Sequence, residues 1–98
     1  MRFYTREQIL ELVGIDGPFF FDLEREEIVC GDAHEEGAYS ERMLERARVA
    51  HELVHELDVN LEGAAIIVRM REDLAALQRD VTTLAEEVRR LREQALRR

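Results

Sequence analysis

Two short helices joined by a tight turn are predicted by residues 5–27, which read TREQILELVGIDGPFFFDLEREE. Thr5 followed three residues later by Gln8 is the pattern of a capping box, in which the two side chains satisfy free N–H groups at the start of a helix. We expect this helix to end at Gly14, because glycine readily takes the left-handed conformation that closes many helices. Its predicted apolar face consists of Ile9, Leu12 and Val13.

The second helix of the pair begins beside a proline. Either Asp16 or Gly17 caps it, since Pro18 then falls in the first turn, where its missing N–H removes no helical hydrogen bond. The helix continues through three phenylalanines toward Glu27. Two short helices separated by a glycine-containing turn are typical of a helix-turn-helix, and we expect that motif here.

Residues 28–37, which follow the motif, carry few signals that favour a helix. Residues 28–30 (Ile-Val-Cys) form a brief extended candidate, and the polar residues 31–37 are turn-like and suit a wing beside the second helix. A third helix begins after Ser40, a preferred cap residue, with Glu41 at the positive end of the helix dipole. Its apolar face at helical spacing is Met43, Ala47, Ala50, Val54 and Leu57.

Asp58, Val59 and Asn60 predict a corner, with Asn60 as the cap of a last helix that has no breaker after Gly63. The predicted fold is therefore mainly α. A winged helix-turn-helix domain occupies residues 1–58, and a long coiled-coil helix occupies residues 59–98.

The last helix has the clearest pattern in the chain, because its apolar residues alternate in steps of three and four. The predicted oligomerisation seam is Ile67, Met70, Leu74, Leu77, Val81, Leu84, Val88 and Leu91, with Ala95 as a further a position. Branched residues at a with Leu at d favour two strands, so we expect a homodimer, although the pattern also tolerates a trimer. Strand orientation stays open, and the part near Ile67 and Met70 could instead pack on the chain's own N-terminal helices.

Composition limits the class of protein. The chain has 98 residues and one cysteine, Cys30, which excludes an intrachain disulfide and a multi-cysteine zinc site. We expect a reducing, cytoplasmic location. The sequence has no apolar run of membrane-spanning length, no apolar signal peptide and no cofactor motif.

Charge is distributed unevenly along the chain. Residues 1–45 hold twelve acidic and four basic residues, which accounts for the whole net charge of −8, whereas residues 46–98 hold ten of each. An acidic half points to a basic partner and away from nucleic acid. The alternative is that these acids only keep a small domain soluble.

Residues 51–55 (His-Glu-Leu-Val-His) match the H-E-x-x-H pattern, in which two histidines one turn apart bind zinc and the glutamate acts as a general base. A catalytic zinc ion usually needs a third protein ligand, and the remaining histidine, His34, lies in the predicted loop. So short a chain also leaves no room for a walled substrate cleft. We therefore interpret the pair as ordinary helix histidines, with no metal, no cofactor and no enzyme activity.

The chain resembles the MerR-like helix-turn-helix superfamily. Ala38-Tyr39-Ser40 and Leu44-Glu45-Arg46 are similar to the segment after the wing in MerR-type proteins. Residues 57–63 (LDVNLEG), followed by Ile66 and Ile67, resemble a signature shared by MerR-type heat-shock repressors and chaperone modulators that bind J-domain co-chaperones. The "HEL" of residues 55–57 is similar to a segment of some modulators. The similarity covers nearly the whole chain.

The two branches differ in function. The repressors bind DNA through the second helix and wing, where they carry basic residues. Here only Arg25 is placed to neutralise a phosphate, whereas DNA affinity needs several such contacts. The resemblance therefore implies a modulator that binds a J-domain protein, an Hsp70 chaperone, or both. A MerR-family DNA-binding transcriptional regulator is the alternative.

An acidic helix-turn-helix is suited to dock on the basic helix with which a J-domain engages Hsp70. The candidate partner-binding residues are Phe19, Phe20, Asp22, Glu24, Glu26, Glu27, Glu35 and Glu36. The two phenylalanines are proposed as apolar anchors. Three consecutive helical positions cannot share one face, so at least one of Phe19, Phe20 and Phe21 must belong to the core.

Overall fold

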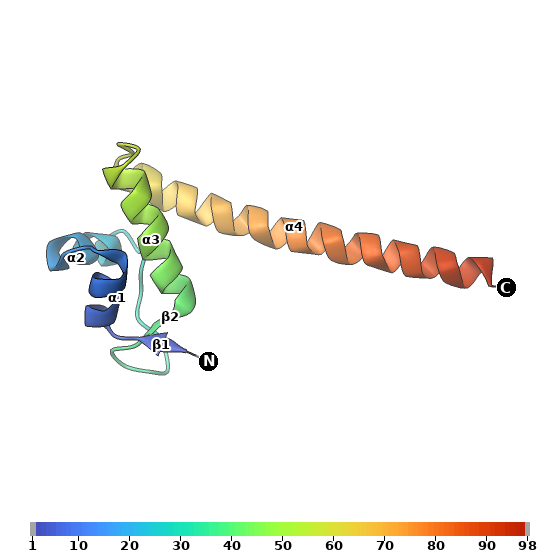
Figure 1. Ribbon diagram of the computed structural model, residues 1–98, viewed down its shortest axis with the longest axis horizontal. Coiled ribbons are helices and arrows are strands. Elements are labelled where there is room, and N and C mark those ends of the chain that lie inside the picture. The colour runs from blue at the N-terminus through green and yellow to red at the C-terminus, as the bar shows by residue number, and fades with distance from the viewer. Residues whose placement is uncertain (1, 98) are drawn as a thin grey trace. The chain divides into compact units, whose positions relative to one another are not determined.

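The computed structural model describes residues 2–97, which form four helices and one pair of short strands (Figure 1). The elements in chain order are β1 (Phe3–Tyr4), α1 (Arg6–Val13), α2 (Gly17–Arg25), β2 (Tyr39–Ser40), α3 (Glu41–His55) and α4 (Leu61–Leu96). The chain divides into a first unit that ends at Val68 and a second that begins at Arg69. The mainly α class and the long last helix are as predicted, but the first two turns of α4 belong to the N-terminal unit.

The helix-turn-helix begins with the predicted caps. The Gln8 backbone N–H donates to the Thr5 hydroxyl at 3.2 Å, and the Thr5 N–H donates to the Gln8 side-chain oxygen at 2.8 Å. Gly14 ends α1 with φ of 80°, a conformation that is costly for other residues. The Asp16 carboxylate accepts from the Phe19 N–H at 2.9 Å, so Asp16 and not Gly17 caps α2.

The two strands were not predicted. β1 pairs with β2 in antiparallel register, with Phe3 opposite Ser40 and Tyr4 opposite Tyr39. Ser40 also caps α3 through the Met43 N–H, so the strand pair fixes the start of that helix. The prediction of an extended segment at residues 28–30 is wrong. Ile28 and Val29 follow α2 in turns and bends and are 2% and 1% exposed, because they serve as core residues.

The core of the first unit lies between the first three helices. Its largest fully buried side chains are Phe20, Ile9, Leu23, Ile28 and Val29. The predicted apolar face of α1 is only partly correct, since Leu12 is 56% exposed while Ile9 is fully buried. Leu12 is exposed because it lies three residues after Ile9, which is about 300° around the helix, or 60° in the opposite sense. That angle places Leu12 at the edge of the apolar face, where this small core does not cover it.

The predicted apolar face of α3 is correct over its first three turns and wrong at the end. Met43, Ala47 and Ala50 are buried, but α3 ends at His55 and leaves Leu57 67% exposed in the corner. Asn60 caps α4 as predicted, with its side-chain oxygen accepting from the Gly63 N–H at 2.7 Å.

The first turns of α4 contact the core through small residues. Ala64, Ala65 and Val68 are buried there, whereas Ile67 and Met70 are 37% and 57% exposed. This part of α4 therefore packs on the core through Ala64, Ala65 and Val68, and not through the side chains of Ile67 and Met70. From Arg69 to Leu96 the helix continues without a break. Within residues 2–97 no helix combines the length and apolarity that crossing a bilayer requires.

Candidate protein-docking surface

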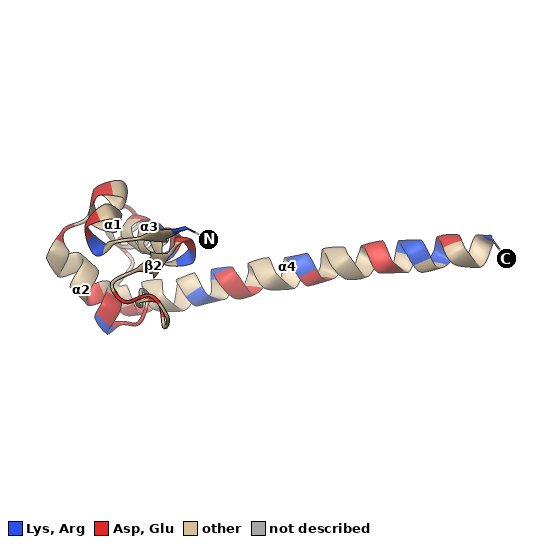
Figure 2. Ribbon diagram, turned by 90° about the horizontal axis from the view of Figure 1, so that it is seen from below, with Lys and Arg blue, Asp and Glu red and all other residues tan. Residues whose placement is uncertain are grey.

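Acidic residues far outnumber basic ones on α2 and in the loop that follows it. Figure 2 shows acidic colour over both elements. Residues 17–38 contain seven acids and a single basic residue, Arg25. Four of the predicted charged contacts, Glu24, Glu27, Glu35 and Glu36, are exposed, whereas Asp22 and Glu26 are partly buried. We call α2 and residues 26–38 the acidic surface.

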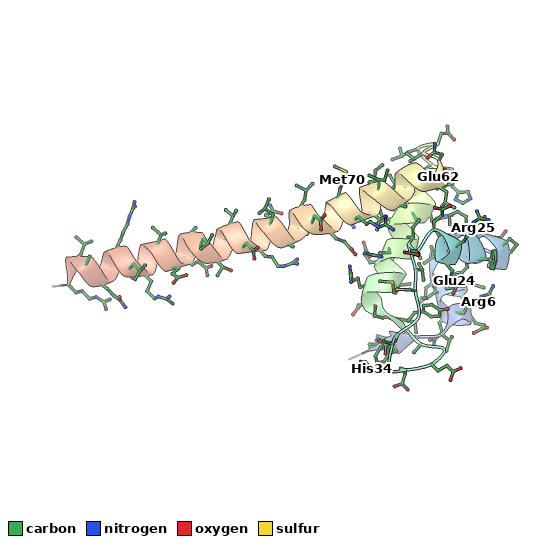
Figure 3. All side chains as sticks on the ribbon, turned by 180° about the vertical axis from the view of Figure 1, so that it is seen from behind. Arg6, Glu24, Arg25, His34, Glu62 and Met70 are labelled. Atoms are coloured by element: carbon green, nitrogen blue, oxygen red, sulfur yellow. The ribbon has the colours of Figure 1, made fainter. Side chains whose placement is uncertain are left out.

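The arginines at this surface are already engaged with groups of the same domain. Arg25 forms an ion pair with Asp22 at 3.3 Å, one turn back on α2. Arg6 of α1 donates to the Gly17 carbonyl at 3.4 Å and lies 5.4 Å from the centre of the Phe20 ring. Both arginines and Glu24 are labelled in Figure 3. The two arginines therefore contact groups of the helix-turn-helix itself, and residues 17–38 keep a net charge of −6 (seven acids and one arginine).

The loop of the acidic surface is held by Asp32. Its carboxylate accepts from the N–H groups of His34 and Glu35, both at 2.9 Å, and its own N–H donates to the Ala38 carbonyl at 2.9 Å. A short acidic side chain that bonds backbone groups two and three residues on stabilises a turn. Asp32, which the candidate set omits, thus positions Glu35 and Glu36.

Tyr39 connects the strand pair to α2. Its hydroxyl donates to the Glu24 carboxylate at 3.1 Å, and its ring meets Phe20 edge to face at 5.3 Å between centroids. Burial is the main cause that raises the pKa of Tyr39 above 10.0, followed by the negative charge of Glu24 and the hydrogen bond to it. Glu24 is therefore an exposed residue that also holds the Tyr39 side chain in place.

The three phenylalanines of α2 have three different environments. Phe20 is fully buried, which removes it from the candidate contacts, and Phe21 is 61% exposed. Phe19 is partly buried and packs edge-on against His55, with 4.8 Å between centroids. Phe21 was missed as a contact, although the requirement that three consecutive residues cannot share a face was the signal that pointed to it. It is the aromatic side chain of α2 best placed to meet a partner.

The rings of the two histidines of the H-E-x-x-H pattern lie next to each other and are tilted by 43°. Their rings lie 4.6 Å apart, and the His55 Nδ1 atom is 3.3 Å from the His51 carbonyl oxygen. Across residues 2–97 no group of three histidine, cysteine or acidic side chains is arranged to hold a metal ion. A hollow of about 280 Å³ is lined by residues of β1 and α1, away from this pair. Both histidines lie on α3 and make edge-on ring contacts with Phe19.

The predicted oligomerisation residues lie in one exposed seam of α4. From Leu74 to Leu91 the six large apolar side chains are between 48% and 64% exposed.

The family described as "MerR HTH family regulatory protein" matches residues 4–93. The chain belongs to this family. Neither the curated proteins nor the solved structures contain a match. The matched residues include the whole helix-turn-helix and most of α4, and the match supports a regulatory role.

Proposed function

We propose that this MerR-family chain is a chaperone modulator that binds the basic helix of a J-domain co-chaperone through its acidic surface. The observation that carries the proposal is the charge of residues 17–38, where seven acids surround one arginine that is already paired with Asp22. The interaction would take place in the cytoplasm, in keeping with a lone exposed cysteine, Cys30. The Hsp70 chaperone itself is the second possible partner.

Binding to DNA through the same surface is opposed by electrostatics. A protein that binds duplex DNA neutralises phosphates with lysine or arginine, and most of its non-specific affinity comes from that exchange. Arg25 is engaged with Asp22, and the exposed side chains around it are carboxylates. Placing them against phosphates would bring like charges together, which costs binding energy.

A basic protein helix would meet favourable groups on this surface. Glu27, Glu35 and Glu36 are exposed and can attract cationic side chains during encounter. Phe21 offers an exposed apolar anchor on α2, and aromatic anchors contribute more affinity than peripheral charges do. The surface thus combines long-range attraction with one aromatic contact.

The test is titration calorimetry of the full chain against the isolated J-domain from the same organism at low and high salt. We expect binding that weakens as salt increases, because exposed charges are screened. The variant Glu27→Arg/Glu36→Arg should bind at least tenfold more weakly, since two attractive contacts become repulsive. The control Glu86→Arg/Glu93→Arg makes the same charge change on α4 and should bind normally.

Absence of binding at low salt, or equal loss in the control variant, would refute the J-domain proposal. In that case Hsp70 is titrated next under the same conditions.

A DNA-binding transcriptional regulator remains the second candidate because the matched family is described as regulatory. It predicts retention of the chain on fragmented genomic DNA at physiological salt and loss of retention in Arg25→Ala. We expect no retention of either protein.

A further inference from the structure

The helices α1 and α2 end in the same backbone arrangement. At the end of α2 the Ile28 N–H donates to the Leu23 carbonyl at 2.9 Å, and Glu27 between them has φ of 58°. A hydrogen bond of the same span, 3.1 Å long, closes α1, where Gly14 has φ of 80°. Both ends are Schellman motifs, in which the residue just past the helix takes the left-handed conformation. Glu27 therefore occupies in α2 the position that glycine occupies in α1.

A glutamate is an unfavourable choice for that position. In the left-handed conformation the Cβ atom of an L-residue comes too close to the carbonyl oxygen that follows, and glycine has no Cβ. Asparagine and aspartate tolerate the conformation best among the other residues. Within residues 2–97 the second residue of this kind is Asp58, with φ of 55°, which belongs to the tolerant class. Glu27 therefore makes the end of α2 less stable than glycine would.

The fold gains no contact from the Glu27 side chain that would offset this loss. The neighbouring acids each have a partner in the same domain, since Asp22 pairs with Arg25 and Glu24 accepts from the Tyr39 hydroxyl. The Glu27 side chain is exposed, and among residues 2–97 its carboxylate takes part in no hydrogen bond or ion pair. A strained residue without a structural contribution points to a role in function.

We propose that Glu27 is the residue of the acidic surface that recognises the partner, through an ion pair between its carboxylate and a lysine or arginine of the partner's basic helix. This inference rests on the function proposed above. The backbone that carries Glu27 is held firmly, because Leu23 and Ile28 on either side are 0% and 2% exposed. A carboxylate on a backbone that is already ordered loses less freedom on binding than one on a mobile loop.

Three substitutions separate the charge of Glu27 from its backbone strain. Glu27→Asp keeps the charge on a residue that tolerates the left-handed conformation, Glu27→Asn keeps the tolerance without the charge, and Glu27→Gly removes both charge and strain. Titration calorimetry of the full chain against the isolated J-domain measures the effect on binding. Glu27→Asp should bind within about twofold of the wild type, whereas Glu27→Asn and Glu27→Gly should bind roughly three- to fivefold more weakly, as expected for one exposed ion pair.

Stability should change in the opposite direction to binding. Glu27→Gly should raise the melting temperature by about 4–8 °C, with smaller increases for Glu27→Asp and Glu27→Asn. The matched control is Gly14→Glu, which places a glutamate in the same motif of α1. No heavy atom lies within 4 Å of a Cβ added at Gly14, so this change introduces backbone strain without a steric clash. It should lower the melting temperature by a similar amount and leave J-domain binding undiminished.

The outcomes distinguish this inference from the function on which it rests. A wild-type chain that does not bind the J-domain refutes the proposed function and the role of Glu27 with it. If the wild type binds and Glu27→Gly or Glu27→Asn binds equally well, the role of Glu27 is wrong and the acidic surface keeps its function. A melting temperature that does not rise in Glu27→Gly also overturns the inference, because Glu27 would then carry no strain.

Discussion

The Tyr39 hydroxyl donates a hydrogen bond to the Glu24 carboxylate at 3.1 Å and so joins the strand pair to the end of α2. Tyr39 itself is 8% exposed. Removing the hydroxyl in Tyr39→Phe should lower the free energy of unfolding by about 1 kcal/mol, the usual net value of such a bond. Urea denaturation at pH 7 measures this change, and an unchanged midpoint would show that water replaces Tyr39 as the partner of Glu24.

The same pair predicts a loss of stability in alkali. The pKa of Tyr39 is raised above 10.0 by burial and by Glu24, so the folded chain holds this proton more tightly than the unfolded chain. The stability that the raised pKa of Tyr39 contributes to the fold is fully present below pH 10, and it is lost as the pH rises through the folded-state pKa. Absorbance titration of tyrosinate in a Tyr4→Phe background should give a pKa above 10.0 that falls in Glu24→Gln. A titration that Glu24→Gln leaves unchanged would contradict the assigned cause.

Neighbouring phenylalanines of α2 should respond in opposite ways to truncation. Phe20 is fully buried, so Phe20→Ala should destabilise the domain by about 3–5 kcal/mol. Phe21 is 61% exposed, and Phe21→Ala should change stability by no more than about 0.5 kcal/mol while weakening binding of the partner protein. Thermal unfolding and calorimetric titration of the same samples separate the effects. If Phe21→Ala binds the J-domain like the wild type, the proposed anchor is wrong.

Arg46 of α3 holds the segment that follows α2, because its Nη1 atom donates to the Ile28 carbonyl at 3.2 Å. Arg46→Met leaves that carbonyl without this donor and should cost about 1–3 kcal/mol. Arg48→Met is the matched control, since Arg48 pairs with Glu45 at 3.3 Å with both side chains about half exposed. It should cost about 0.5 kcal/mol or less. Equal losses in the two variants would mean that Arg46 acts only through general helix stability.

Chelation tests the interpretation of the H-E-x-x-H pattern. Because His51 and His55 pack on Phe19 and no third ligand is in place among residues 2–97, treatment with EDTA should leave the melting temperature unchanged. A bound structural metal would instead stabilise the fold by mass action and be lost on chelation. Stoichiometric zinc that survives gel filtration and disappears in His51→Ala would contradict this expectation.

Local signals in the sequence predicted the helices well. Thr5, Asp16, Ser40 and Asn60 all act as caps, because a cap depends on residues within one turn. The strand pair was missed because it joins residues 35 and 37 positions apart and each strand is only two residues long. A pattern that short carries no periodicity by which it could be recognised.

The sequence predicted the charge of the candidate surface, but it did not predict which apolar side chain the surface exposes. The acids of α2 and the loop are visible in the composition of residues 17–38. Which phenylalanine is buried depends on the rotation of α2 against α1 and α3, and adjacent positions differ by about 100° around a helix. Periodicity alone could not choose between Phe20 and Phe21, just as it could not show that Ala64 and Ala65, rather than Ile67, approach the core.

The positions of the aromatic side chains give the two units separate optical signals. The chain has no tryptophan, and its two tyrosines and four phenylalanines all lie between Phe3 and Tyr39, within the first unit. Near-ultraviolet circular dichroism and tyrosine fluorescence therefore report only on the helix-turn-helix, whereas α4 supplies 36 residues of the far-ultraviolet helical signal. If the near- and far-ultraviolet unfolding transitions coincide, the chain unfolds as one cooperative unit. If the far-ultraviolet transition moves to lower temperature on dilution, the long helix melts first.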